Sequence, residues 1–158
     1  MWELLALVLL VIAALANASV FGTDFFCAVV ARSAMSRVDD GTLGRTMGFI
    51  HYYGDRRMPI PGVVAMVASI LAAVSASLAG SFAAAALIAS GVIAAAVWLA
   101  VYARVSAPLN KVMVAAVLED RVPSDIRELQ RRWDSVINLR VLLQGYPLAA
   151  LCVSIALL

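Results

Sequence analysis

Residues 60–102 read IPGVVAMVASILAAVSASLAGSFAAAALIASGVIAAAVWLAVY and include no charged side chain. A membrane-spanning helix needs about 20 apolar residues to cross roughly 30 Å of hydrocarbon, so the stretch is long enough for two such helices. Gly80 and Ser81 near its middle suit the turn between them. The stretch therefore predicts two membrane spans, residues 60–79 and 82–102, that form a helical hairpin.

Two further apolar segments, residues 2–31 and 136–158, flank this hairpin. The whole chain is 64% hydrophobic and 14% charged, with a mean hydropathy of +0.97. A soluble domain averages about 45–50% apolar and about 25% charged residues, so this composition excludes a soluble monomer, a disordered chain and a protein that binds nucleic acid through a basic face. We expect a single domain, residues 1–158, with an all-α fold: an integral membrane four-helix bundle.

The basic residues indicate how the bundle is oriented. All 12 Lys and Arg residues lie between Arg32 and Arg57 or between Arg104 and Arg140. The positive-inside rule then predicts two long cytoplasmic connections and both termini outside the cytoplasm, in a multi-pass protein of the cell (inner or plasma) membrane. Glu3 stands where a secretory signal would carry a basic residue, so we expect the first segment to be retained.

Both connections carry helical patterns. Residues 42–53 mix apolar and polar side chains without proline and predict a short interfacial helix. From the second connection onward, one helical face carries four residues: Trp133, Ile137, Arg140 and Gln144. We therefore expect the fourth helix to begin in the cytoplasm and to enter the membrane without a break.

Asp24 is the only acidic residue well inside a predicted span. A carboxylate inside a membrane is costly and is by default a candidate functional group, here for proton transfer. The alternative is a structural role, in which Asp24 bonds to Thr23, to Asn17 or to an arginine of another helix.

His51 is the only histidine, so a di-iron site, a haem pair or a multi-histidine copper site is excluded. A histidine has an unperturbed pKa of about 6.5 and can serve as a general base. The alternative is that His51, between aromatic neighbours at the interface, is only solvated or packed.

The remaining polar candidates lie at a similar predicted depth. Arg140 and Gln144 should face the bundle interior, although Arg140 has the alternative of extending to the lipid headgroups. We expect one group of side chains near the cytoplasmic end of the bundle: Asp24, His51, Asn110, Trp133, Asn138 and Arg140. Helical bundles place ligand sites in their interior, and an apolar cavity with a few polar groups suits a flat, lipophilic ligand.

Several short motifs occur in a characteristic order along the chain. Pro108-x-Asn110 follows the third span, and after a polar segment Trp133 and then Arg140 open the fourth. Together with Gly22 in the first span, this order resembles the anthrone oxygenase-like family of four-helix membrane proteins, over most of the chain.

The resemblance implies a small membrane oxygenase that converts an anthrone to an anthraquinone in polyketide tailoring, without a metal, flavin or other cofactor. Such a reaction needs a base near the acidic methylene and hydrogen-bond donors or cations around the developing oxyanion. The implied catalytic residues are Asp24, His51 and Arg140. The implied substrate-binding residues are Asn110, Trp133, Asn138, Gln144 and Tyr52.

Other functions remain open at this point. The same residues would serve a cofactor-free cyclase or isomerase of a lipophilic polyketide. A proton-coupled exporter would use Asp24, although small exporters typically have short loops, unlike the two long connections expected here. A structural subunit, a homo-oligomer, and one weakly bound metal ion held by Asp24, His51 and Asp55 are further alternatives. The expected partners are a lipophilic small molecule and the lipid bilayer, with no nucleic acid.

Overall fold

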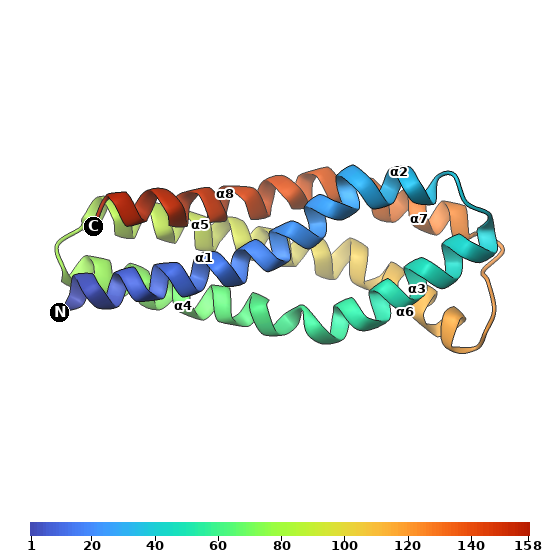
Figure 1. Ribbon diagram of the computed structural model, residues 1–158, viewed down its shortest axis with the longest axis horizontal. Helices are drawn as coiled ribbons and strands as arrows, with labels where there is room; N and C mark the ends of the chain where they lie inside the picture. Colours follow the sequence, from blue (N-terminus) through green and yellow to red (C-terminus); the bar gives the residue numbers. More distant parts are fainter.

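The computed structural model describes residues 1–158 and is entirely helical, with no strand. The chain forms four long helical rods (Figure 1). In chain order, their elements are α1 (Trp2–Phe26), the π-helix η1 (Cys27–Ala31) and α2 (Arg32–Met35); α3 (Asp40–Arg57) and α4 (Pro59–Leu78); α5 (Phe82–Val101), the π-helix η2 (Tyr102–Ser106) and α6 (Ala107–Leu118); and α7 (Ile126–Asp134) and α8 (Ile137–Ala156).

Each rod is long and apolar enough to cross a membrane, which confirms the prediction of four spans and is typical of a membrane protein. The rods run over Trp2–Met35, Asp40–Leu78, Phe82–Leu118 and Ile126–Ala156. At 1.5 Å per residue they are about 45–60 Å long and exceed the hydrocarbon thickness of a bilayer.

The predicted hairpin is present. Gly80 lies between α4 and α5 with a φ of 86°, in the left-handed region that glycine adopts without steric cost. Both chain termini lie at this end of the bundle, and the α2–α3 and α6–α7 connections lie at the other end (Figure 1).

The two segments that join the predicted spans are more helical than expected. Only residues 36–39 and 119–125 lie outside helices there, because α2 continues the first rod and α3, α6 and α7 extend the others with buried apolar residues of their own. The predicted interfacial helix is part of α3, which begins where the Asp39 carboxylate accepts hydrogen bonds from the Thr42 backbone N–H and hydroxyl. Leu43 and Met47 on its inner face are fully buried, so α3 packs as part of the bundle.

The fourth rod is also not continuous. α7 ends at Asp134 and α8 begins at Ile137, with a turn at Ser135 and Val136. The Ser135 hydroxyl donates a hydrogen bond to the Arg132 carbonyl, and such a local bond competes with regular helical bonding. The prediction of an unbroken helix is therefore wrong by one short turn.

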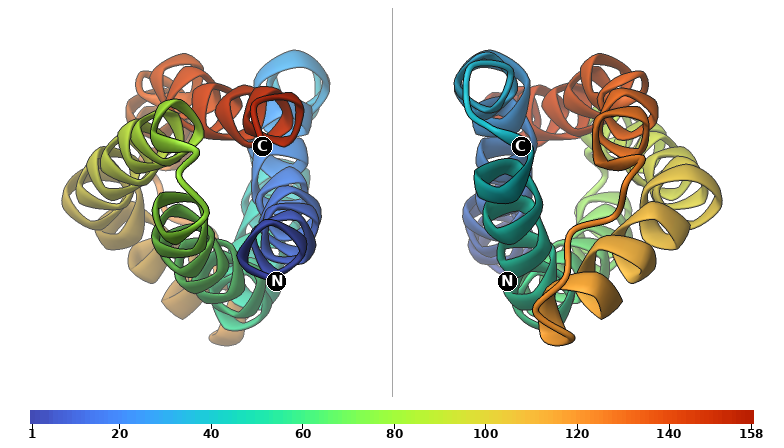
Figure 2. Two further views of the ribbon diagram at one scale, coloured as in Figure 1. Left: turned by 90° about the vertical axis from the view of Figure 1, so that its left-hand side faces the viewer. Right: turned by 90° about the vertical axis from the view of Figure 1, so that its right-hand side faces the viewer.

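The rods enclose a central axis (Figure 2), with α1 in contact with α4 and α8, and α5 in contact with the same two helices. Two apolar cores lie along that axis. The alanine-rich core consists of Ala6, Leu10, Ala13, Ala68, Ala72, Ala76, Ala84, Ala85, Ile88 and Leu151. The leucine–methionine core consists of Cys27, Ala28, Leu43, Met47, Leu109, Met113, Ile126, Leu129, Trp133 and Ile137. Small residues let helices approach closely where lipid removes the hydrophobic driving force, which fits the first core.

Candidate functional site

A buried ion pair lies between the two cores. Arg140 on α8 donates from Nη2 to Asp24 Oδ1 at 2.6 Å and from Nε to Asp24 Oδ2 at 3.2 Å. Asp24 is 2% exposed and Arg140 5%. The arginine from another helix is thus the partner of Asp24, and the alternative that Arg140 extends to the headgroups is wrong. A buried carboxylate needs such a partner, because an unpaired charge there is strongly destabilising.

Further contacts fix the pair in place. Trp98 Nε1 donates to Asp24 Oδ2 at 2.8 Å, and Arg140 Nη1 donates to Ser106 Oγ at 2.8 Å. The Arg140 guanidinium carbon lies 5.3 Å from the Trp98 and Trp133 rings and 5.4 Å from the Tyr102 ring. Three aromatic rings at this distance stabilise a cation through their π-systems.

The π-helix η2 helps to assemble this arrangement. Trp98, Tyr102 and Ser106 are spaced four residues apart and all contact Arg140. An α-helix with 3.6 residues per turn would rotate such a series gradually away from one face. A π-helix has wider turns with i→i+5 bonds, so it reduces that rotation and keeps the three side chains on the same face.

A second hydrogen-bond network lies next to the ion pair. Asp55 on α3 accepts a hydrogen bond from the Tyr102 hydroxyl at 2.6 Å and two from Asn110 Nδ2 at 3.0 and 3.2 Å. Asn110 Oδ1 in turn accepts from Trp133 Nε1 at 2.9 Å. These bonds use both ends of the Asn110 amide and hold Trp133 in a fixed orientation.

His51 lies beside this network without joining it. Its ring is 5.3 Å from that of Trp133, and its residue is 5% exposed. His51 Nε2 is buried and has no hydrogen-bond partner. Buried polar atoms are nearly always paired in folded proteins, so an unpaired imidazole nitrogen marks a site that a ligand or water would complete.

Both networks border one cavity of about 340 Å³ between the two cores. Its polar lining residues are Asn17, Thr23, Asp24, His51, Asp55, Ser69, Asn110, Arg140 and Gln144, and its aromatic ones are Trp98, Tyr102 and Trp133. Val63 on α4 and Leu99 on α5 also line it, although both are more than half exposed. The cavity therefore reaches the apolar outer surface of the bundle near these two side chains.

Most of the predicted site residues meet in this cavity. Those that line it are Asp24, His51, Asn110, Trp133, Arg140 and Gln144. Asn138 does not, because it follows buried Ile137 by one residue and so faces outward, where it is exposed. Tyr52 does not either; its ring lies 3.6 Å from the Arg56 guanidinium carbon on the outer side of α3.

Sequence reasoning missed several contributors, namely Asn17, Trp98, Tyr102 and Ser106 as site residues and Asp55 as a hydrogen-bond partner. Trp98 and Tyr102 end an apolar span, where aromatic residues usually mark the membrane interface rather than a site. The repeated spacing of four from Trp98 to Ser106 was the available signal. Nothing in the sequence indicates that this spacing is matched by a π-helix.

The metal alternative does not fit the side chains. No group of three or more His, Cys, Asp or Glu residues is placed to hold a metal ion. Both Asp24 oxygens accept from Arg140 and Trp98, while Asp55 accepts from Tyr102 and Asn110. Asp24, His51 and Asp55 therefore do not form a shared ligand set.

No protein-family model matches the chain, and searches of curated proteins and of solved structures also find no match. Chemically, the site combines a fixed cation, an unpaired imidazole nitrogen and aromatic walls in a cavity open to an apolar surface.

Proposed function

We propose that the protein is a membrane-embedded, cofactor-free oxygenase that acts on a planar, lipophilic polycyclic substrate of the anthrone type. The observation that carries this proposal is the pairing of two groups in one cavity. His51 and Arg140 both line this cavity, and His51 Nε2 is buried without a hydrogen-bond partner. A base and a fixed cation in one cavity are the two groups that formation and stabilisation of a carbanion require.

His51 is a better base than Asp24. Both Asp24 oxygens accept hydrogen bonds, two from Arg140 and one from Trp98. Taking up a proton at Asp24 would break the ion pair, whereas His51 Nε2 has no bond to lose. Asp24 therefore acts as a positioning residue for Arg140, and the role of base moves to His51.

Arg140 keeps donors available for the substrate. Its guanidinium carries five N–H groups, of which three bond to Asp24 and Ser106. Two N–H groups remain for an oxygen of the substrate. Asn110 is less suited to this role than expected, because its amide already bonds to Asp55 and Trp133.

The proposed reaction balances with molecular oxygen as the oxidant. His51 removes a proton from the methylene between two aromatic rings. The negative charge of the carbanion spreads onto the carbonyl oxygen of the substrate, beside Arg140. The carbanion transfers electrons to O₂ and forms a C–O bond, and His51 returns the proton to the resulting peroxide. Loss of the second methylene proton and cleavage of the O–O bond then give the ketone and one water.

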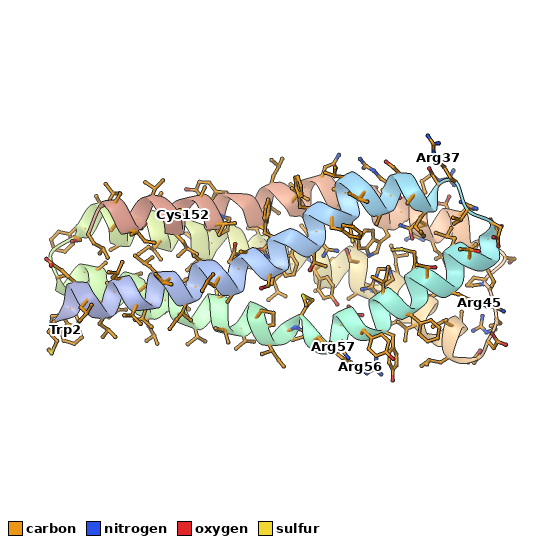
Figure 3. All side chains as sticks on the ribbon, in the orientation of Figure 1. Trp2, Arg37, Arg45, Arg56, Arg57 and Cys152 are labelled. Atoms are coloured by element: carbon orange, nitrogen blue, oxygen red, sulfur yellow. The ribbon has the colours of Figure 1, made fainter.

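The bundle would lie in a cell membrane with its basic end in the cytoplasm and both described termini outside. Arg56 and Arg57 lie past the middle of the long axis on the side away from Trp2, and Arg37 and Arg45 lie toward the end opposite Trp2 (Figure 3). Thr23 contacts Met58 at 3.6 Å, so Asp24 lies level with the start of α4. The cavity would then lie at the membrane boundary, and its opening near exposed Val63 and Leu99 would admit a substrate dissolved in the bilayer.

An oxygen electrode tests the proposal with purified protein in lipid nanodiscs and an anthrone as substrate. We expect O₂ uptake above the spontaneous rate, lost in His51→Ala and His51→Gln. Tyr52→Phe is the matched control, because the neighbouring Tyr52 lies outside the cavity and should keep full activity. Wild-type uptake at the spontaneous rate, or full activity in His51→Ala, would refute the oxygenase. A cyclase or isomerase would instead convert its substrate without O₂ uptake but with the same dependence on His51.

A further inference from the structure

Two amide side chains line the cavity on the side of the ion pair away from His51. Asn17 on α1 and Gln144 on α8 both line the cavity, and each is at most 5% exposed. Asn17 Nδ2 donates to Gln144 Oε1 at 2.7 Å. This single bond uses one of the two amide nitrogens and one of the two amide oxygens.

The groups without a bond are one amide oxygen, an acceptor, and one amide nitrogen, a donor. Asn17 Oδ1 is buried with no partner, and Gln144 Nε2 donates to no other group of the chain. Turning both amides over would make Gln144 Nε2 donate to Asn17 Oδ1, and would leave Asn17 Nδ2 and Gln144 Oε1 unused. In either orientation the pair therefore offers one donor and one acceptor.

We propose that this amide pair is a subsite for a hydroxyl group on the substrate. A hydroxyl oxygen accepts from the free amide N–H while its hydrogen donates to the free carbonyl, so one small group completes both side chains. A ketone or ether would satisfy only the donor. A carboxylate would bring negative charge against the carbonyl oxygen without a hydrogen to share. The planar ring system of the ligand rests on the proposed function, but the hydroxyl rests on the amide pair alone.

The helix geometry places this hydroxyl away from the reacting carbon. Asn17 precedes Asp24 by seven residues on the same helix, which corresponds to about 10 Å. Gln144 follows Arg140 by one helical turn, and Trp133, beside His51, precedes Arg140 by two turns in the opposite direction. The substrate should therefore be elongated, with the carbon to be oxidised between His51 and Arg140 and a hydroxyl on the ring that lies deepest in the bundle.

The subsite is tested by binding rather than by turnover. The probes are anthraquinone and 2-hydroxyanthraquinone, which differ by one hydroxyl and have no methylene to oxidise. Their dissociation constants are measured in nanodiscs from the quenching of tryptophan fluorescence, because Trp98 and Trp133 line the cavity. Partition into empty nanodiscs is subtracted for each probe. We expect wild-type protein to bind the hydroxylated probe roughly tenfold more tightly, as two added hydrogen bonds allow.

Two variants remove the two halves of the subsite. Asn17→Leu and Gln144→Leu should each lose the preference for the hydroxylated probe while keeping the affinity for anthraquinone. Asn138→Leu is the control, because Asn138 is an exposed amide on the same helix outside the cavity and should keep the preference. Should Asn17→Leu fail to fold, the wild-type comparison and Gln144→Leu decide.

The outcomes separate the subsite from the oxygenase. Equal affinity of wild-type protein for the two probes would overturn the subsite and leave the pair as a structural contact or a water site. A preference that persists in both leucine variants would overturn it as well. A clear preference without O₂ uptake on an anthrone would uphold the subsite and refute the oxygenase, while uptake without a preference would do the reverse.

Discussion

The Asp24–Arg140 ion pair joins α1 to α8 at the level where one core ends and the other begins. Along the first rod, Asp24 lies between Ala13 of the alanine-rich core and Cys27 of the leucine–methionine core. The pair is thus the main polar connection between the first and last rods, and it holds a cation beside the cavity.

Removal of one partner of this pair should destabilise the fold. Asp24→Asn or Arg140→Gln leaves the other charge buried and unpaired, which typically costs about 3–5 kcal/mol. The double variant removes both charges and should recover a large part of that loss. Thermal or denaturant unfolding in detergent, analysed as a double-mutant cycle, measures the coupling.

An exposed ion pair provides the control for this cycle. Arg45 and Asp120 approach to 3.5 Å with side chains that are 66% and 87% exposed. Arg45→Ala should change the free energy of unfolding by less than about 1 kcal/mol. Similar losses from Arg45→Ala and Arg140→Gln would contradict a special role for the buried pair.

The opening of the cavity can be narrowed from outside. Val63→Trp adds a bulky ring where an exposed side chain lines the cavity. For the proposed oxygenase we expect kcat/KM on an anthrone to fall roughly tenfold, which corresponds to about 1.4 kcal/mol. Val67→Trp is matched in position, one turn further along α4, and exposed, but does not line the cavity and should have little effect. Equal activity of the two variants would place the entrance elsewhere.

The contact between α3 and α6 depends on a glycine. A Cβ at Gly48 would lie 2.7 Å from Val117 Cβ and 3.0 Å from the Met113 carbonyl oxygen. Gly48→Ala should therefore lower the free energy of unfolding by about 1–3 kcal/mol through overpacking. Gly54→Ala on the same helix meets no atom within 4 Å and should be neutral or stabilising by up to about 1 kcal/mol. Thermal unfolding of both variants checks the difference, and equal melting temperatures would show that the helices separate easily.

The start of α3 should be sensitive to acid. Hydrogen bonds from the Thr42 hydroxyl and backbone N–H lower the pKa of Asp39 below its ordinary value of 3.8. The unfolded chain then takes up this proton at a higher pH than the folded chain, so the cap stabilises fully above 3.8 and is lost as the pH falls through the folded pKa. Hydrogen exchange at Thr42 should accelerate in that range beyond its intrinsic rate. Asp39→Asn caps without titrating and should show no such acceleration.

The sequence predicts the helices better than their ends. Apolar runs define the four spans, and one face of the fourth helix was correctly predicted from Trp133 to Gln144, because both follow from local periodicity. The length of the helices within the connections was not predicted, since α3 and α6 are far apart in the sequence and pack against each other only in the assembled fold. The local sequence pattern carries no information about that contact.

The site is predictable in depth but not in detail. The positive-inside rule and helical spacing predicted that Asp24, His51 and Arg140 lie at a similar depth along the bundle. In the structure all three line the same cavity. Rotation about each helix decides which neighbours face inward, and this excluded Asn138 while admitting Trp98. The contact of Asp24 with Arg140 spans 116 residues, so only the assembled fold reveals it.

The two π-helices also divide the bundle into two halves that pack in separate registers. Each adds a wide turn directly after Phe26 or Val101, where the alanine-rich core gives way to the leucine–methionine core. A wide turn changes the direction, around the helix axis, in which all later side chains of the rod point. Each half of the molecule therefore has its own packing register, and deletion of one residue within η1 would rotate α2 against its neighbours while leaving α1 in phase.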